Sequence, residues 1–248
     1  MNLASDDTTS QPRAAADGAP VGRRVVLGLL ALGAAGVAAG PTVSRLLGDL
    51  SGALSAHDPT GLSSLIPGGG FRYYTVTDGF PWESPDRYRL HVTGNVSREL
   101  TLTLDDLHAM PRTTLTRDFQ CVTGWRVRGV HWEGVLLSDL LDRAVPDSDQ
   151  TALQFVSYDG VYTESLTLQQ ARRPDVMVAD TIDGKPVGRA HGGPARLLVT
   201  PMYGYKSCKW LSEIRVVDKV IPGYWEREGY DVDAWVGHSN GRTDAPTS

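Results

Sequence analysis

The sequence predicts an α+β fold with a strand-rich, mixed core and short helices. Segments in which apolar and polar residues alternate outnumber segments with helical spacing. The strands and helices do not follow one another in the regular rhythm of a parallel α/β protein. Asp-Gly pairs and prolines end the segments at short intervals, as turns do.

In the first half of the domain, alternation predicts strands at residues 71–76, 88–93, 100–104 and 112–119. A short helix is expected over 105–110, because Pro111 then stops it. The leucine spacing of 136–144 predicts a second helix.

In the second half, strands are expected at 152–158 and 161–166, joined by the turn pair Asp159-Gly160. Thr167 and Gln170 have the spacing of a capping box, which predicts a helix that ends before Pro174. The remaining expected elements are a strand at 176–179 with a hairpin turn at Asp183-Gly184, a buried strand at 196–200, a single helical turn over 207–211 and a strand at 214–217.

The chain start predicts export. The first 20 residues are polar and small, so residues 1–45 are expected to be a disordered start plus a signal or anchor. Arg23-Arg24 precede an uncharged, Gly/Ala-rich run at 25–44, the pattern of a twin-arginine signal that could be cleaved after Ala39. An ordinary secretory signal is the alternative, and so is an uncleaved membrane anchor, because twenty uncharged residues suffice to span a bilayer.

The rest of the chain divides into a linker, a domain and a tail. Residues 46–70 read as a linker that ends in three glycines, 71–240 as the folded domain and 241–248 as a polar tail. The length of 248 residues fits one domain or a domain plus an extension. The formal charge of −5 gives no sign of a nucleic-acid-binding surface.

Cys121 lies where a predicted strand ends and a loop begins, within 118–125. A rigid scaffold can hold a thiol there at a cleft, which suits a metal ligand or a nucleophile. Two other interpretations are open. A lone cysteine is often a small buried hydrophobe, and a disulfide between Cys121 and Cys208 would stabilise an exported protein but consume the ligand.

Three further segments follow Cys121 in order. They begin with His191-Gly192-Gly193-Pro194-Ala195-Arg196, continue with Lys209-Trp210-Leu211, and end with a Tyr-Trp segment at 223–230. With Cys121 this set resembles the sulfite oxidase family of molybdopterin enzymes, over roughly residues 70–240. The resemblance implies a sulfite-oxidase-type molybdopterin-binding fold and the cofactor Mo-molybdopterin. It also implies transfer of an oxygen atom to or from a small sulfur-containing or other oxo substrate.

The resemblance also implies roles for individual residues. Cys121 would be the molybdenum ligand, and a thiolate suits this metal. The cofactor contacts that it implies are Tyr74, Ser157, His191, Arg196, Ser207, Cys208 and Lys209, with the basic side chains and the backbone amides of 207–209 on the pterin phosphate. Arg126 lies five residues after Cys121, where sulfite oxidases place an arginine that holds the anionic substrate. Arg128 and His131 would complete a positive mouth, or the three would be a solvated loop.

The partners follow from the same resemblance. A core without its own electron relay implies a haem-containing membrane protein or a cytochrome as electron partner, in the periplasm or at the outer face of the membrane, and a monomer. Two other functions stay open. Cys121 could be a thiol nucleophile activated by His131 or His191, or the domain could be a non-catalytic exported module that binds an anion.

Overall fold

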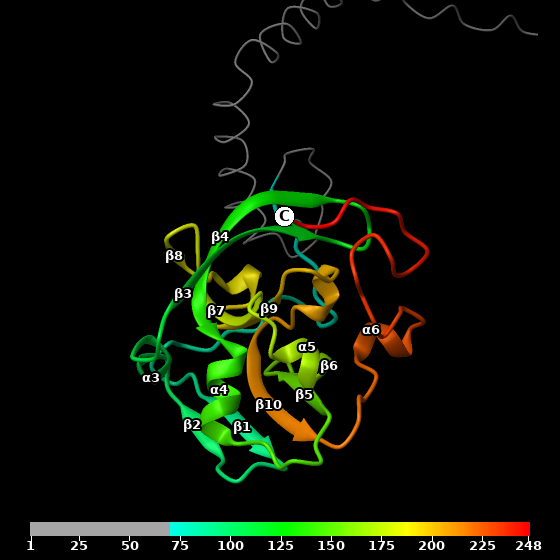
Figure 1. The fold of residues 1–248 in the computed structure, drawn as a ribbon. Helices are drawn as coiled ribbons and strands as arrows, with labels where there is room; N and C mark the ends of the chain where they lie inside the picture. The colour runs from blue at the N-terminus through cyan, green and yellow to red at the C-terminus, as the bar shows by residue number, and fades with distance from the viewer. Residues whose placement is uncertain (1–69) are drawn as a thin grey trace, which may run out of the picture. The chain divides into compact units, whose positions relative to one another are not determined.

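The computed structural model describes residues 70–248 (Figure 1). The predicted signal or anchor at 1–45 and nearly all of the predicted linker at 46–70 therefore lie outside the described residues. Within the described part, every helix is too short or too polar to cross a bilayer.

One five-stranded sheet is mixed. Its strands, in spatial order, are β2 (Leu100–Leu102), β1 (Leu90–Gly94), β10 (Leu211–Val217), β5 (Ala152–Ser157) and β6 (Thr163–Thr167). β1 and β10 run parallel, with His91 opposite Glu213, while the other neighbours are antiparallel. The central strand β10 thus comes from the end of the domain and joins its beginning to its middle.

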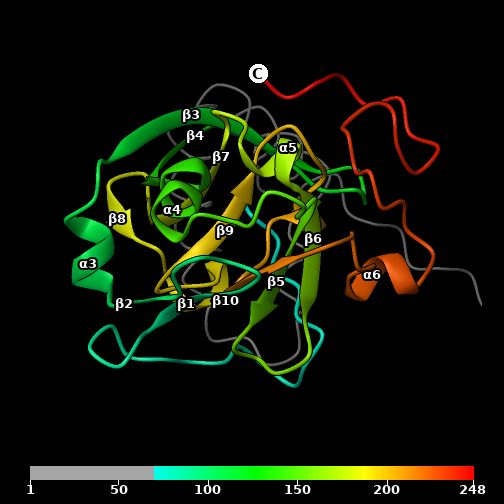
Figure 2. The same ribbon diagram turned by 60° about the horizontal axis from the view of Figure 1, so that its bottom comes forward.

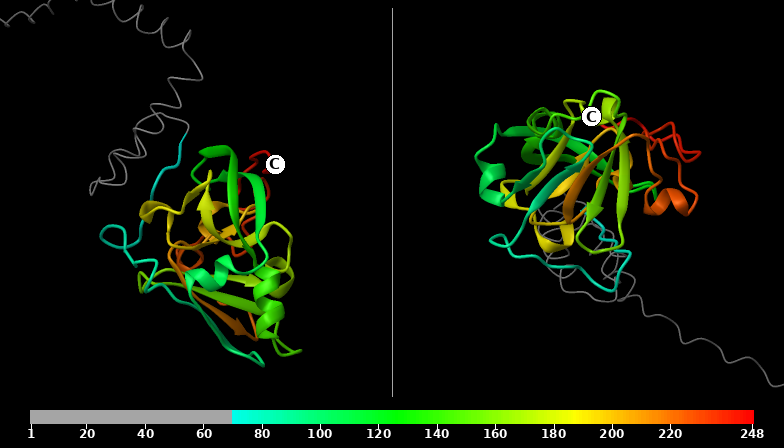
Figure 3. Two further views of the ribbon diagram at one scale, coloured as in Figure 1. Left: turned by 90° about the vertical axis from the view of Figure 1, so that its left-hand side faces the viewer. Right: turned by 90° about the horizontal axis from the view of Figure 1, so that it is seen from below.

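The second sheet is antiparallel. Its path runs β3 (Thr113–Gln120), β4 (Arg126–Leu136), β7 (Val176–Ile182) and β8 (Lys185–Pro186), and β9 (Arg196–Val199) also pairs with β7. The left view of Figure 3 shows the long β3–β4 hairpin at one end of the domain and the mixed sheet at the other. The segments that follow β3 and β9 carry the residues discussed below.

The helices are short. They are α3 (Leu104–His108), α4 (Leu137–Ala144), α5 (Leu168–Ala171), α6 (Tyr224–Arg227) and the 3-10 turns η2 (Arg189–His191) and η3 (Gly204–Lys206). The capping box predicted at Thr167 and Gln170 is confirmed, since each side chain accepts the other residue's backbone N–H. Helix α4 lies beside β4 and β7 (Figure 2). It therefore holds the C-terminal end of β4, the second strand of the β3–β4 hairpin, in place.

Two hydrophobic clusters lie on opposite faces of the antiparallel sheet. Leu197 of β9 belongs to the main cluster, together with Leu140 of α4 and Phe155 of β5. The next residue, Leu198, belongs to the second cluster with Trp132 of β4. Successive side chains of a strand point to opposite faces, so β9 is held rigidly from both sides.

Three predicted elements are wrong. Residues 71–76 form no strand but an extended segment without a ladder partner. The helical turn expected at 207–211 lies earlier, at η3, and Leu211 already begins β10. Leu104 opens α3 instead of ending a strand, because Thr103 caps that helix.

The longest strand, β4, was not predicted, because Gly124, two residues before it, was interpreted as a break and 131–134 as the approach to a helix. Gly134 lies at a register shift between β4 and β7. A Cβ atom there would come within 2.0 Å of the Val178 carbonyl oxygen. Glycine is therefore required where the two strands approach closely, and it does not end the strand.

Candidate active site

A cavity of about 310 Å³ opens between segments that are distant in sequence. Its walls come from the extended segment 71–76, from Phe119 and the loop after β3, and from the turn at 159–162. The remaining walls come from η2, β9, η3, the segment 207–210 before β10, and α6. This volume lies at the lower end of the range for small-ligand and cofactor sites. Residues far apart in the chain thus converge on one space.

Cys121 lines this cavity directly after the end of β3. Its N–H donates to the Trp125 carbonyl at 2.9 Å, and the Gly124 N–H donates back to the Cys121 carbonyl at 3.0 Å. Gly124 has φ +102°, which favours glycine. The Cys121 Sγ lies 3.2 Å from the Thr123 hydroxyl. The thiol is thus held by a closed backbone turn, as predicted for a residue at a strand end.

Arg196, the first residue of β9, is buried beside the cavity. Its guanidinium donates to three backbone carbonyls, among them those of His191 at 2.7 Å and Ser207 at 2.9 Å. It has no carboxylate partner among residues 70–248. Burial lowers the pKa of Arg196 to about 10, and no carboxylate of the described residues offsets this loss of hydration.

Lys209 and His191 add to the same basic group. The Lys209 ammonium donates to the Tyr74 carbonyl and lies 4.3 Å from the centre of the Trp210 ring. Burial, followed by the charge of Arg196, lowers the pKa of Lys209 to about 7. Burial, then Arg196 and Lys209, lowers the pKa of His191 to about 3, and its Nε2 lies 2.9 Å from the Tyr73 hydroxyl. An anion bound here would relieve all three groups.

Two polar atoms on the cavity lining have no hydrogen-bond partner within residues 70–248. They are Oδ2 of Asp159 and Nε1 of Trp125, and both are buried. The other Asp159 oxygen accepts the N–H groups of Val161 and Tyr162. A buried polar atom without a partner costs about 1–3 kcal/mol, so both atoms suit a ligand's polar groups. The sequence indicated Asp159 only as a turn residue. No sequence pattern predicted that its side chain would line the cavity.

The predicted cofactor contacts divide into two sets. Tyr74, His191, Arg196, Ser207 and Lys209 line the cavity with Cys121, so the structure brings them together.

Ser157 and Cys208 do not line it. Ser157 lies beneath the turn and accepts the Asp159 N–H at 3.1 Å, so it supports a cavity residue. Cys208 is fully buried in the main cluster, and burial raises the pKa of its thiol well above the usual value. Both cysteines are free, so the disulfide alternative is wrong.

Arg126 is held away from the cavity. It donates to the Gln120 side chain at 2.6 Å, to Asp118 at 3.2 Å, and to the carbonyls of Pro246 and Ala245 in the segment 241–248. The structure therefore does not place Arg126 at the cavity mouth, where a substrate-holding role would require it. Arg128 and His131 are exposed on β4.

The comparisons with known proteins agree with this arrangement. The family model described as "Oxidoreductase molybdopterin binding domain" matches residues 78–225, more than half of the chain. The chain belongs to this family. The resemblance stated from the sequence is thus confirmed, and with it the strand-rich fold, the enzyme class and molybdopterin as cofactor.

Relatives in the family act on sulfur compounds, as their names say. Human mitochondrial sulfite oxidase is 32% identical over 175 residues, which cover 59% of this chain and 32% of the human protein. The protein-methionine-sulfoxide reductase catalytic subunit MsrP of Ralstonia nicotianae is 28% identical over 235 residues, 82% of this chain and 71% of that protein. The chain thus spans only about a third of the human enzyme.

A solved structure shares the fold. The sulfane dehydrogenase SoxCD of Paracoccus pantotrophus superimposes with a TM-score of 0.53 at 27% sequence identity. The match covers 58% of this chain and 41% of the SoxCD chain.

Proposed function

We propose that this domain binds Mo-molybdopterin in the cavity, with Cys121 as the protein ligand of the metal, and transfers an oxygen atom to or from a small, neutral sulfur compound. The observation that carries this proposal is the convergence of one free thiol with the buried Arg196 and the partly buried Lys209, neither of which has an acidic partner among residues 70–248. The bound cofactor supplies the oxygen-transfer and electron chemistry, while the protein supplies position and charge.

The cavity residues fit this cofactor. Arg196 and Lys209 present donors without a carboxylate, which a phosphate group would complete through charge-assisted hydrogen bonds. Asp159 Oδ2 and Trp125 Nε1 offer one acceptor and one donor to the polar edges of a pterin. Position 204 requires glycine, since a Cβ there would come within 2.5 Å of the Phe119 ring, which also lines the cavity.

The surroundings of the thiol favour a neutral substrate. Phe71, Phe119, Val122 and Trp125 line the cavity around Cys121. Arg126, the charge that would attract an anion such as sulfite, is already engaged by Asp118 and by the chain's last residues. With Arg196 and Lys209 assigned to the cofactor phosphate, the apolar wall around the thiol suits a sulfoxide or thioether better than a dianion.

Export and an electron partner are part of this proposal. The Arg23-Arg24 pair with its uncharged run supports the twin-arginine route. Among residues 70–248, no three or more metal-binding side chains lie together. We expect electrons to come from a membrane haem protein or a cytochrome.

The test is cofactor analysis of protein made in a host that synthesises molybdopterin. We expect molybdenum and pterin in equal amounts, and turnover of dimethyl sulfoxide with a reduced artificial electron carrier. Cys121→Ser should abolish turnover without unfolding the protein. Cys208→Ala removes a side chain that does not line the cavity and leaves the backbone amide in place, so this variant should keep its turnover. Metal-free protein, or full turnover by Cys121→Ser, would refute the ligand assignment.

The substrate preference has its own test. Arg126→Met should leave sulfoxide turnover unchanged, because the side chain does not reach the cavity. If the wild-type protein instead oxidised sulfite faster than it reduced sulfoxides, and Arg126→Met removed that activity, the neutral-substrate assignment would be wrong.

A further inference from the structure

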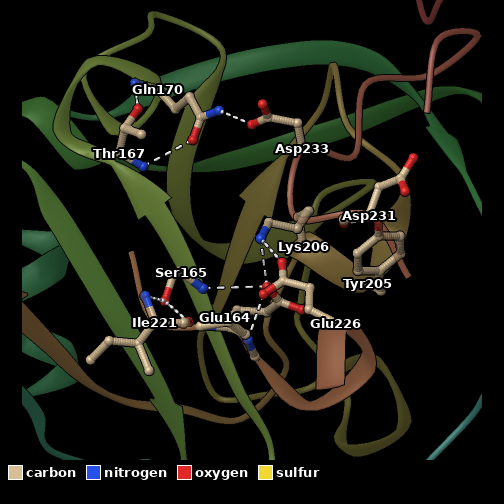
Figure 4. Close-up of polar contacts among 12 residues, drawn as sticks. Glu164, Ser165, Thr167, Gln170, Tyr205, Lys206, Ile221, Glu226, Asp231 and Asp233 are labelled. Atoms are coloured by element: carbon tan, nitrogen blue, oxygen red, sulfur yellow. Dashed lines mark hydrogen bonds and ion pairs between the residues drawn. The ribbon is translucent and has the colours of Figure 1, made fainter. Parts of the chain in front are cut away.

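A buried ionic cluster joins η3, β6 and α6 (Figure 4), and its sequence neighbours Tyr205 and Trp225 line the cavity. Lys206 of η3 makes ion pairs with Glu164 of β6, at 2.8 Å, and with Glu226 of α6. The side chains of both glutamates have no exposed surface, and that of Lys206 is 1% exposed. Three separate segments thus meet in one contact that is inaccessible to bulk solvent.

The charges of this cluster do not balance. Two carboxyl groups share one ammonium, and their other partners are neutral: the N–H groups of Ser165 and Gly223 and the Tyr162 hydroxyl. If both glutamates were ionised, one negative charge would remain buried, which is costly. A proton on one carboxyl removes that charge.

Of the two carboxyls, Glu164 is the one that faces the Tyr162 hydroxyl, and its raised pKa favours the protonated form. The titratable groups that face it are Lys206, Glu226, Tyr162, Tyr205 and Cys208. Burial raises the pKa of Glu164 to about 8; Lys206 opposes this rise and Glu226 adds to it. At neutral pH the carboxyl is therefore mostly protonated.

Tyr162 connects this carboxyl to the cavity. Its hydroxyl lies 3.3 Å from Oε1 of Glu164 and donates to the Tyr205 carbonyl at 2.5 Å, and Tyr162 itself lines the cavity. Burial raises the pKa of Tyr162 well above the usual value, so the phenol does not hold a negative charge. It can pass a proton only by accepting one as it gives up its own.

We propose that Glu164 stores a proton for the oxygen-transfer reaction and that Tyr162 hands it to the cavity. This inference rests on the proposed function. Reduction of a sulfoxide to a thioether consumes two electrons, here from a one-electron haem donor acting twice, and two protons, and it releases one water. Glu164 supplies one proton: its O–H bond breaks and a new bond forms to Tyr162 Oη, while the tyrosine hydroxyl turns from the Tyr205 carbonyl toward the cavity and gives its own proton to the oxygen that leaves the substrate. The second proton enters from solvent.

After the transfer, the Glu164 carboxylate is stabilised by Lys206 until solvent returns the proton. In the oxidative direction the same steps run backwards, with Glu164 as the acceptor. Glu164 touches neither substrate nor cofactor, so its effect on the reaction passes entirely through Tyr162.

The first test is infrared titration of the holoenzyme, which follows the C=O stretch of a buried protonated carboxyl. The wild type should show a band that disappears with a midpoint near pH 8. Glu164→Gln should lack this band. Glu226→Gln should shift the midpoint to lower pH, because Lys206 then faces a single carboxylate and the cluster is neutral without the proton. A wild type without the band, or the same midpoint in Glu226→Gln, would overturn the proposal.

The second test is the pH dependence of kcat for sulfoxide reduction. We expect the wild-type kcat to fall as pH rises past the infrared midpoint, and Glu226→Gln to move this fall to lower pH. Glu164→Gln should lower kcat by about a hundredfold, the lower end for a positioned proton donor, and remove the pH dependence while KM and molybdenum content stay unchanged. Tyr162→Phe should slow kcat but keep the infrared titration.

The outcomes separate the two proposals. An active wild type with an equally active Glu164→Gln would reject the proton store and leave the proposed function intact. A molybdenum-loaded wild type that turns over no sulfoxide would reject the proposed function, and the infrared titration would still report whether Glu164 holds the proton.

Discussion

Lys206 and Lys209 lie three positions apart in the sequence, yet their ammonium groups have different surroundings. Lys206 is buried between two carboxyl groups and faces away from the cavity. Lys209 faces the cavity, and among the described residues its ammonium contacts a carbonyl and two aromatic rings but no carboxylate, so burial and Arg196 lower its pKa to about 7. A paired buried cation joins segments of the fold, whereas an unpaired one indicates a ligand that supplies the missing charge.

The largest difference between the two lysines should appear in stability. Lys206→Met leaves two carboxyls buried without a cation, and removing one partner of a buried ion pair costs about 3–5 kcal/mol. Lys209→Met removes a desolvated, unpaired charge, so cofactor-free protein should lose no stability. Urea denaturation of both variants measures this. An equal loss of unfolding free energy in both variants would show that the two lysines do not differ in their contribution to stability.

The next effect concerns retention of the cofactor. Lys209→Met and Arg196→Gln should each weaken it about tenfold to a hundredfold, since hydrogen bonds to charged groups contribute about 1.5–3 kcal/mol. Molybdenum content after dialysis of the purified protein reports this loss. Arg128→Met is the matched control, because Arg128 is exposed on β4, and its molybdenum content should equal that of the wild type.

The two regions should also respond to pH in opposite directions. The folded pKa of Lys209 lies near 7, below its ordinary 10.5, so the unfolded chain binds more protons in that interval and stability rises with pH. The folded pKa of Glu164 lies near 8, above its ordinary 4.5, so stability falls as pH rises from 4.5 to 8. Each slope is at most about 1.4 kcal/mol per pH unit.

Unfolding of cofactor-free protein at several pH values measures both slopes. Lys209→Met should remove the rise above pH 7, and Glu164→Gln should remove the fall below pH 8. If Lys209→Met kept the alkaline rise, another group would be its source, and the unpaired state of Lys209 would be wrong.

The smallest effect is expected at Arg126, a cation that is paired at the rim of the fold. Arg126→Met should lower stability by about 1 kcal/mol, an average value for a point mutation, through its bonds to Asp118 and Gln120. Thermal unfolding measures this change. A loss as large as that of Lys206→Met would show that rim pairs and buried pairs contribute equally.

Local patterns predicted much of this fold. The hairpin around Asp159-Gly160, the capping box at Thr167 and the strand end before Cys121 all depend on neighbours in sequence, and the structure has them. Residues 71–76 have strand-like composition, but no ladder partner reaches them, and sequence alone does not show that.

Only those site residues that belong to sequence motifs could be predicted from the sequence. Cys121, His191, Arg196 and Lys209 stood out by order and spacing, and they meet at one cavity. The cluster of Glu164, Lys206 and Glu226 was not predictable, because its members lie on three elements and pair only through tertiary contacts. Arg126 had a suggestive spacing, yet long-range hydrogen bonds to 245–246 decide where it points.

The last residues of the chain close over the hairpin that leads to the thiol, as Figure 1 shows for the C-terminus beside β3 and β4. The Asp118 N–H donates to the Ser248 carbonyl at 3.1 Å, and Thr247 bonds to the Thr200 carbonyl. A purification tag joined directly after Ser248 would therefore pull on the strand that positions Cys121. Workers who express this protein should compare preparations tagged at that end with untagged ones before they interpret a low specific activity.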